Sequence, residues 1–290
     1  MEISASMVKD LRERTGAGMM DCKKALEECK GDMDKAIDYL REKGISKAAK
    51  KAERIAAEGL ANVYVNGNDA VVLELNSETD FVAKNQEFKD LLDTIGNTIL
   101  NNKVTDMESA LKLEVDGSTV NDLIVNATAR IGEKISLRRF EKVTKSDKEV
   151  FGTYLHMGGK IASLTVVEGD NAEVAKDVAM QAAAMRPLYV SVESVPEEDL
   201  EHEKSVIKEQ VINEGKKPEF ADKIVEGRIR KFYEETVLEE QAFIKDSGIS
   251  IKTYLENNKC KLVKLVKYEV GEGMEKRNDN FAEEVMSQIK

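Results

Sequence analysis

The amino-acid sequence predicts an α+β protein with an N-terminal three-helix domain, two related αβ core subdomains with antiparallel sheets, and a protruding antiparallel helical hairpin. Three observations support this fold class. Apolar residues recur at helical spacing through residues 4–44, and the order hairpin then helix occurs twice, about ninety residues apart. Residues 197–236 combine high charge with few apolar positions. A chain of 290 residues is also long enough for several compact units.

The N-terminal region predicts three short helices. Glycines punctuate it at Gly18 and Gly31, and Gly44 is expected to end the third helix. A unit of this size is marginally stable alone. We therefore expect the Ala-rich stretch 46–58 to join it to the rest of the chain as a helix or linker.

The first αβ half begins with a tight hairpin, because residues 66–69 (Asn-Gly-Asn-Asp) tolerate positive φ between two apolar runs. A helix with an apolar stripe follows, and Asn85 is its N-cap candidate. The expected elements are strands at 61–65, 70–75 and 135–143 and helices at 88–99 and 120–134.

The second half repeats this order around Met157-Gly158-Gly159. A helix ends at Pro187, and the alternating stretch 188–192 predicts one more strand. The expected elements are strands at 152–156, 160–167 and 188–192 and a helix at 171–185.

Two strongly charged helices are predicted within residues 197–236, on either side of Gly215-Lys216-Lys217-Pro218. Their apolar seam is narrow, which favours a solvated hairpin over a buried bundle. The expected seam residues are Leu200, Ile207, Val211, Phe220, Ile224, Phe232 and Val237. The tail predicts a helix at 251–256, a strand at 262–270, a glycine turn and a final amphipathic helix carrying Phe281, Val285 and Ile289.

Composition restricts the partner and the compartment. Forty-four basic and 55 acidic residues give a net charge of −11, which disfavours direct binding of nucleic acid. No run approaches eighteen apolar residues, and the N-terminus lacks the pattern of an export signal. We expect a cytoplasmic protein that does not bind a membrane.

Catalytic and cofactor motifs are not found in the sequence. The two histidines, His156 and His202, lie far apart, and neither has a metal-ligand spacing. No phosphate-binding glycine loop is present, and Cys22, Cys29 and Cys260 are expected to be reduced. We therefore expect no enzyme activity, no cofactor and no metal. A thiol or metal-dependent enzyme would require His156 to meet a cysteine in the fold.

Residues 78–85 are unusual because Phe81 and Val82 lie between a strand and the N-cap of the next helix. From physical chemistry alone, the favoured interpretation is a hydrophobic staple. Phe81 would then pack on the first helical turn, and Asp80 would gain from the positive end of the helix dipole.

Several stretches together resemble the elongation factor Ts family. Residues 11–26 read Leu-Arg-Glu-Arg-Thr-Gly-Ala-Gly-Met-Met-Asp-Cys-Lys-Lys-Ala-Leu, and residues 79–85 read Thr-Asp-Phe-Val-Ala-Lys-Asn. Residues 131–133, 225–228 and 268–273 extend the resemblance over essentially the whole chain.

The resemblance implies a guanine-nucleotide exchange factor that binds elongation factor Tu·GDP, displaces Mg²⁺ and promotes GDP release in translation elongation. It also implies a division of the chain into modules. These are a ubiquitin-associated-like (UBA-like) domain with a linker helix (1–55), core subdomain N (56–143), the first part of core subdomain C (144–196), a coiled-coil hairpin (197–236), a return to the core (237–270) and a C-terminal module (271–290).

The resemblance further assigns residues to the partner interface. The segment that disturbs the partner's Mg²⁺ site corresponds here to Thr79, Asp80, Phe81 and Val82. The other expected contacts are His156, Arg12, Met19, Met20, Lys23 and Gly132.

Two questions stay open on the sequence alone. One is whether the assembly is one-to-one or a homodimer or dimer of heterodimers formed through the hairpin. The other is an alternative function as a helical scaffold protein, with a ubiquitin-type recognition module and a self-associating hairpin. A scaffold has no need of an exposed Asp-Phe pair before a helix, so the exposure of Phe81 discriminates between the two functions.

Overall fold

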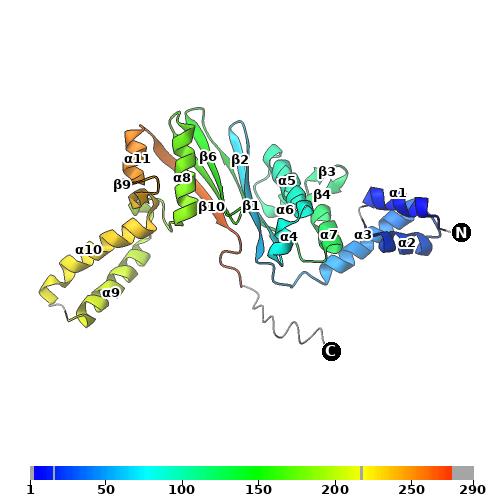
Figure 1. Ribbon diagram of the computed structural model, residues 1–290, viewed down its shortest axis with the longest axis horizontal. Coiled ribbons are helices and arrows are strands. Elements are labelled where there is room, and N and C mark those ends of the chain that lie inside the picture. The colour runs from blue at the N-terminus through cyan, green and yellow to red at the C-terminus, as the bar shows by residue number, and fades with distance from the viewer. Residues whose placement is uncertain (1–2, 16, 216–217, 276–290) are drawn as a thin grey trace. The chain divides into compact units, whose positions relative to one another are not determined.

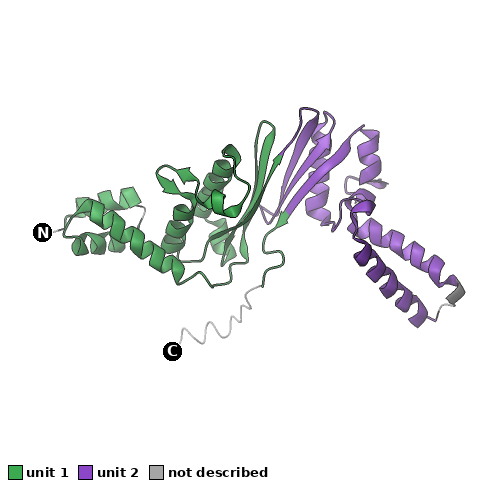
Figure 2. Ribbon diagram, turned by 180° about the vertical axis from the view of Figure 1, so that it is seen from behind, with its two compact units in different colours: residues 1–143, 268–290 green, residues 144–267 purple. Residues whose placement is uncertain are grey.

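The computed structural model of the chain contains two compact units, residues 1–143 with 268–290 and residues 144–267 (Figure 2). The structure describes residues 3–15, 17–215 and 218–275. Over these ranges the fold is mixed α+β, with three N-terminal helices and several small antiparallel sheets (Figure 1). The predicted fold class is confirmed at that level.

The three N-terminal helices are α1 (Ala5–Thr15), α2 (Met19–Glu28) and α3 (Met33–Ala49), as predicted. Leu11, Cys22 and Leu26 are fully buried at their centre. Gly44 does not end the third helix, so that expectation is wrong. Gly44 is buried and lies against helix α7 (Val120–Ile131), where an added Cβ would make an ordinary van der Waals contact, 3.7 Å from the Ala129 Cβ. The helix runs through Gly44 to Ala49, and the contact with α7 would also accommodate an alanine at this position.

The first unit also contains a three-stranded sheet in the order β1-β2-β5. Helices α5 and α7 contribute to the core on this sheet, which includes Leu73, Phe88 and Ile95. The Asn85 side chain accepts a hydrogen bond from the Glu87 N–H, so the predicted N-cap is confirmed. The elements are β1 (Glu58–Asn66), β2 (Asp69–Ser77), α4 (Asp80–Lys84), α5 (Gln86–Asn101), α6 (Met107–Leu111), β3 (Glu114–Val115), β4 (Ser118–Thr119), α7 (Val120–Ile131) and β5 (Ser136–Thr144).

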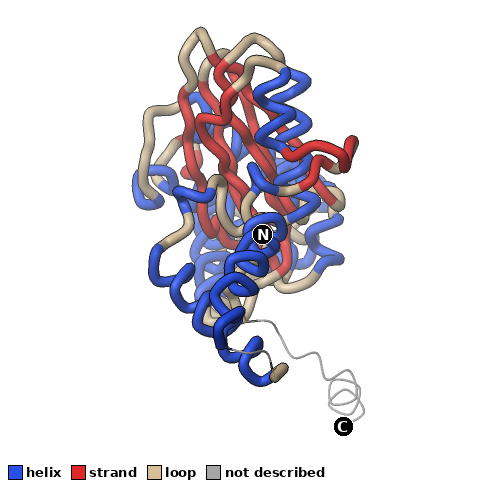
Figure 3. The backbone as a smooth tube through the Cα atoms, turned by 90° about the vertical axis from the view of Figure 1, so that its left-hand side faces the viewer, coloured by secondary structure: helices blue, strands red, loops and turns tan. Residues whose placement is uncertain are grey.

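The second unit has a sheet in the order β10-β7-β6, with helix α8 packed along β6 and β7. In both units the strands form hairpins and the longer helices pack against them. Figure 3 distinguishes the helices and strands of the chain by colour. The elements are β6 (Glu149–His156), β7 (Ile161–Glu168), α8 (Ala172–Met185), the 3-10 helices η1 (Val192–Ser194) and η2 (Leu238–Glu240), β8 (Ala242–Phe243), β9 (Asp246–Ser250), α11 (Ile251–Asn257) and β10 (Lys261–Glu269).

The strand expected at residues 188–192 is wrong. Tyr189 makes only an isolated parallel bridge to Val237, and the Leu188 and Tyr189 N–H groups both donate to the Thr236 carbonyl. The alternating pattern therefore reflects a segment attached to the base of the hairpin.

Helices α9 (Glu197–Asn213) and α10 (Pro218–Thr236) pack against each other along a narrow apolar seam, as predicted. The seam buries Ile207, Val211 and Ile229. Phe220 was expected in this seam but is 56% exposed, so that assignment is wrong.

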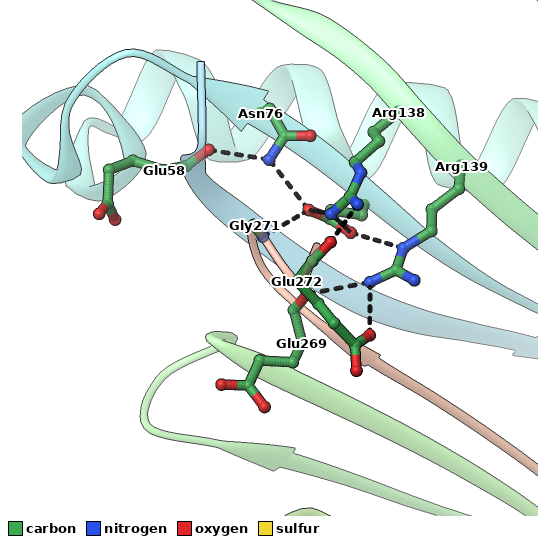
Figure 4. A network of polar contacts seen from close by, with 8 residues as sticks. Glu58, Asn76, Arg138, Arg139, Glu269, Gly271 and Glu272 are labelled. Carbon is green, nitrogen blue, oxygen red and sulfur yellow. Dashed lines mark hydrogen bonds and ion pairs between the residues drawn. The ribbon is translucent and has the colours of Figure 1, made fainter. Parts of the chain in front are cut away.

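A polar network holds the chain where it returns to the first unit after β10 (Figure 4). Glu74 on β2 is fully buried and accepts hydrogen bonds from the Gly271 N–H at 2.9 Å and from Arg139 Nε at 2.7 Å. Arg138 and Asn76 also donate to this carboxylate. The final helix predicted around Phe281, Val285 and Ile289 lies outside the described residues.

Candidate functional site

The segment of Thr79, Asp80, Phe81 and Val82 forms the start of α4, a five-residue helix between β2 and α5. Thr79 is its N-cap, and its hydroxyl oxygen accepts a hydrogen bond from the Val82 N–H at 3.4 Å. Val82 is partly buried against the core of the first unit, and Ala83 is buried. The inward face of this short helix is therefore attached to the core.

Phe81 points away from that core. Its side chain is 81% exposed, so it does not pack on the first helical turn and the staple interpretation is wrong. The Lys84 Nζ lies 6.0 Å from the centre of the Phe81 ring, and it also pairs with Asp80 at 2.6 Å. The helix thus presents an aromatic ring and a carboxylate next to each other at the surface.

Glu133 attaches the start of α4 to the end of α7. Its Oε2 atom accepts hydrogen bonds from the Glu78 N–H at 3.2 Å and the Thr79 N–H at 3.0 Å. Its Oε1 atom accepts from the Thr79 hydroxyl at 2.7 Å. In return, Glu78 Oε1 accepts from the Lys134 N–H at 2.6 Å and from Arg54 at 3.3 Å. Two segments that are distant in sequence are joined by each other's carboxylates.

Gly132 directly precedes this contact. It ends α7 in the left-handed conformation, with φ 90°, and an added Cβ would meet nothing within 4 Å in the part of the chain that the structure describes. Glycine is favoured here because residues with a Cβ seldom adopt such a φ.

The four N-terminal candidates lie on exposed positions of α1 and α2, in the same unit as Phe81 but on other helices. Met19 is 58% and Met20 75% exposed. Lys23 is exposed and lies 3.9 Å from Glu27, and the Arg12 side chain is exposed on α1. Two neighbouring exposed methionines form an adaptable apolar surface.

His156 belongs to the second unit. It is the last residue of β6, paired with Ile161, and its ring centre lies 6.1 Å from that of Tyr154. The following turn carries Met157, which is 67% exposed with φ 50°. His156 thus stands at the base of a hairpin tip that ends in a flexible apolar side chain.

Among the described residues, no three or more His, Cys, Asp or Glu side chains lie together so that they could hold a metal ion. Over the same residues, no helix is long and apolar enough to cross a membrane.

The family model described as Elongation factor TS matches residues 78–272, about two-thirds of the chain. The chain belongs to the elongation factor Ts family. It is therefore a guanine-nucleotide exchange factor for elongation factor Tu in translation elongation, and not an enzyme. The matched region begins at Glu78, immediately before the segment that carries Phe81.

The hydrogen bonds that Glu133 makes to residues 78–79 could not be predicted from the sequence. The stretch Ile131-Gly132-Glu133 supports the family resemblance, but nothing in its local pattern points to Thr79, 54 positions away. Only the folded chain brings the carboxylate to the start of α4.

Proposed function

We propose that Thr79, Asp80, Phe81 and Val82 form a wedge that enters the nucleotide-binding domain of elongation factor Tu, disturbs the Mg²⁺ site and releases GDP. The observation that carries this proposal is the 81% exposure of Phe81 on a helix whose other face is attached to the core. An exposed aromatic side chain on a rigid support gains apolar contacts only when a partner covers it.

Magnesium explains why a small intrusion is sufficient. Mg²⁺ requires near-ideal octahedral geometry and links nucleotide phosphates to the protein that binds them. Displacing one ligand weakens nucleotide binding, and by linkage incoming nucleotide weakens the binding of the exchange factor to the same extent. A coupling free energy of about 4 kcal/mol changes affinity about 1,000-fold, so the factor can both release GDP and be released itself.

Further contacts are proposed on both units. The exposed Met19 and Met20, with Arg12 and Lys23, would bind the partner's nucleotide-binding domain from the UBA-like module, and Gly132 would approach it beside the wedge. His156, supported by its hairpin tip, would press near the phosphate loop from the second core subdomain.

The remaining modules follow from the same proposal. The C-terminal module (271–290) would contact another domain of the partner. The complex would form in the cytoplasm, where elongation factor Tu works. The α9–α10 hairpin is the proposed surface for a dimer of heterodimers. Analytical ultracentrifugation of the complex, with and without the hairpin, measures that stoichiometry.

The test is release of fluorescent GDP from elongation factor Tu, measured at millimolar Mg²⁺ and after Mg²⁺ is chelated with EDTA. If the wedge acts on the Mg²⁺ site, the protein accelerates release strongly with Mg²⁺ present and much less without it. Equal acceleration under both conditions would show that another contact drives release.

A further inference from the structure

We infer that Glu133 is a positioning residue for exchange: it fixes the start of α4 so that Phe81 and Asp80 are held ready for the partner. This inference rests on the proposed wedge. It assigns a role to a side chain that does not itself belong to the segment Thr79, Asp80, Phe81 and Val82.

The Glu133 carboxylate accepts three hydrogen bonds from the segment before α4. Glu133 accepts from the Glu78 N–H, the Thr79 N–H and the Thr79 hydroxyl, at 3.2, 3.0 and 2.7 Å. Hydrogen bonds to an ionised acceptor are about twice as strong as neutral ones. All three donors belong to the two residues that precede α4, so their position is set by Glu133.

The Thr79 hydroxyl links Glu133 to the helix α4. It donates its one hydrogen to Glu133, and its lone pair accepts from the Val82 N–H at 3.4 Å. The bond to Glu133 therefore holds the Thr79 hydroxyl in the orientation in which its oxygen can accept from the first turn of α4. Cap geometry and the carboxylate are coupled through this single oxygen.

Helix α4 is too short to be stable by itself. Its five residues are far fewer than the ~12 that an isolated helix needs for marginal stability. Val82 and Ala83 hold its inner face, whereas Phe81 makes little contact with the core. The direction in which the ring points therefore depends on how the start of the helix is held.

A reciprocal hydrogen bond joins Glu78, before α4, to Lys134, after α7. The Glu78 side chain is only 7% exposed, and it accepts from the Lys134 N–H at 2.6 Å. Glu133 and Glu78 thus tie the two segments together at adjacent points. A tie at two points resists rotation of the segment, which a single hydrogen bond does not. Preorganisation of this kind raises affinity by removing the cost of ordering on binding.

The test is a double-mutant cycle between Glu133→Gln and Phe81→Ala, with GDP release measured against the concentration of this protein. Gln keeps the shape but loses the charge and one acceptor atom. We expect the half-saturating concentration to rise about tenfold in Glu133→Gln, and the melting temperature to fall by only a few degrees. In the Phe81→Ala background, the same change should cost less than about twofold.

Conservative variants separate positioning from general stability. Thr79→Val removes both bonds of the Thr79 hydroxyl, so its half-saturating concentration should rise at least as much as that of Glu133→Gln. Glu87→Gln is the matched control, because Glu87 on α5 pairs with Arg130 on α7 and this ion pair does not involve residues 78–79. Its exchange should be unchanged.

The outcomes distinguish the two proposals. If Glu133→Gln has no effect, or costs the same with and without Phe81, Glu133 does not act through the wedge and this inference is wrong. If Phe81→Ala itself leaves exchange unchanged in a folded protein, the proposed wedge is wrong, whatever Glu133 does.

Discussion

The backbone N–H of Gly271 donates a hydrogen bond to the buried carboxylate of Glu74 at 2.9 Å, joining residues 197 positions apart. Arg138 and Arg139 bind the same carboxylate from β5, and Arg139 also donates to the Glu269 carbonyl (Figure 4). One fully buried acid therefore holds the returning chain on the sheet of the first unit.

Replacing this acid should destabilise the first unit. Glu74→Gln leaves two arginines without their buried counter-charge, and we expect the free energy of unfolding to fall by about 2–3 kcal/mol. Urea denaturation followed by circular dichroism measures the change. Glu272→Gln is the control, because the Glu272 carboxylate is half-exposed and pairs with Arg139 at the surface, so its loss should cost less than about 1 kcal/mol.

Acid should weaken the same contact. Burial raises the pKa of Glu74, but the hydrogen bonds from Gly271, Asn76, Arg139 and Arg138 outweigh burial and hold the pKa below its usual value of 4.5. Because the folded pKa is lowered, the stabilisation is complete above 4.5 and is lost as pH falls through the folded pKa. Unfolding measured between pH 6 and pH 3 should show a weaker pH dependence for Glu74→Gln than for wild type; equal slopes would contradict the assignment.

Substitution by alanine should destabilise the protein to different extents at the two glycines that follow β10, Gly271 and Gly273. Both have positive φ, 74° for Gly271 and 70° for Gly273. A Cβ on Gly271 would lie 2.3 Å from the Ala57 carbonyl oxygen, whereas one on Gly273 meets no atom of the described residues within 4 Å. Gly273→Ala should cost only about 1 kcal/mol for the backbone strain, and Gly271→Ala clearly more. Thermal melting compares them, and equal losses would rule out the close approach at Gly271.

Truncation of Phe81 should separate binding from stability. Because the ring is 81% exposed, Phe81→Ala should barely change the melting temperature. If it fills a partner pocket, its loss costs about 2 kcal/mol, a thirtyfold weaker interaction with elongation factor Tu. Leu188→Ala removes another exposed apolar side chain, 71% accessible, and should leave exchange unchanged. A large drop in melting temperature with normal exchange per folded Phe81→Ala molecule would favour a structural role.

Shortening the hairpin should leave the second unit folded. Its seam of Ile207, Val211 and Ile229 is a separate apolar cluster from the core around α8. The base must be kept, because Asp199 accepts a hydrogen bond from Tyr189 and the Phe232 ring lies 6.5 Å from the Tyr189 ring. Replacing residues 204–229 by a short Gly-Ser linker should preserve cooperative unfolding within a few degrees. Loss of cooperativity would show that the arm is part of the core.

Local sequence patterns predicted most of the secondary structure. The apolar stripe of Phe88 to Ile99 and the cap at Asn85 predict α5, and the Asn-Gly turn at 66–69 predicts the first hairpin. These signals suffice because helices and tight hairpins depend on residues only a few positions apart. The error at residues 188–192 arose where a neighbouring element, the base of the hairpin, determined the local structure. The error at Gly44 arose because a single glycine within a helical pattern does not by itself end the helix.

The sequence by itself determined the order of the elements, the narrow seam of the hairpin and the Thr79 to Asn85 motif that indicates the family. Only the tertiary structure decided that Phe81 is exposed rather than packed on its helix, that Glu133 holds Thr79, and that Glu74 holds Gly271. The physical reason is separation along the chain. A contact between residues 54 or 197 positions apart leaves no periodic mark in either segment, and exposure depends on which surfaces the whole fold covers.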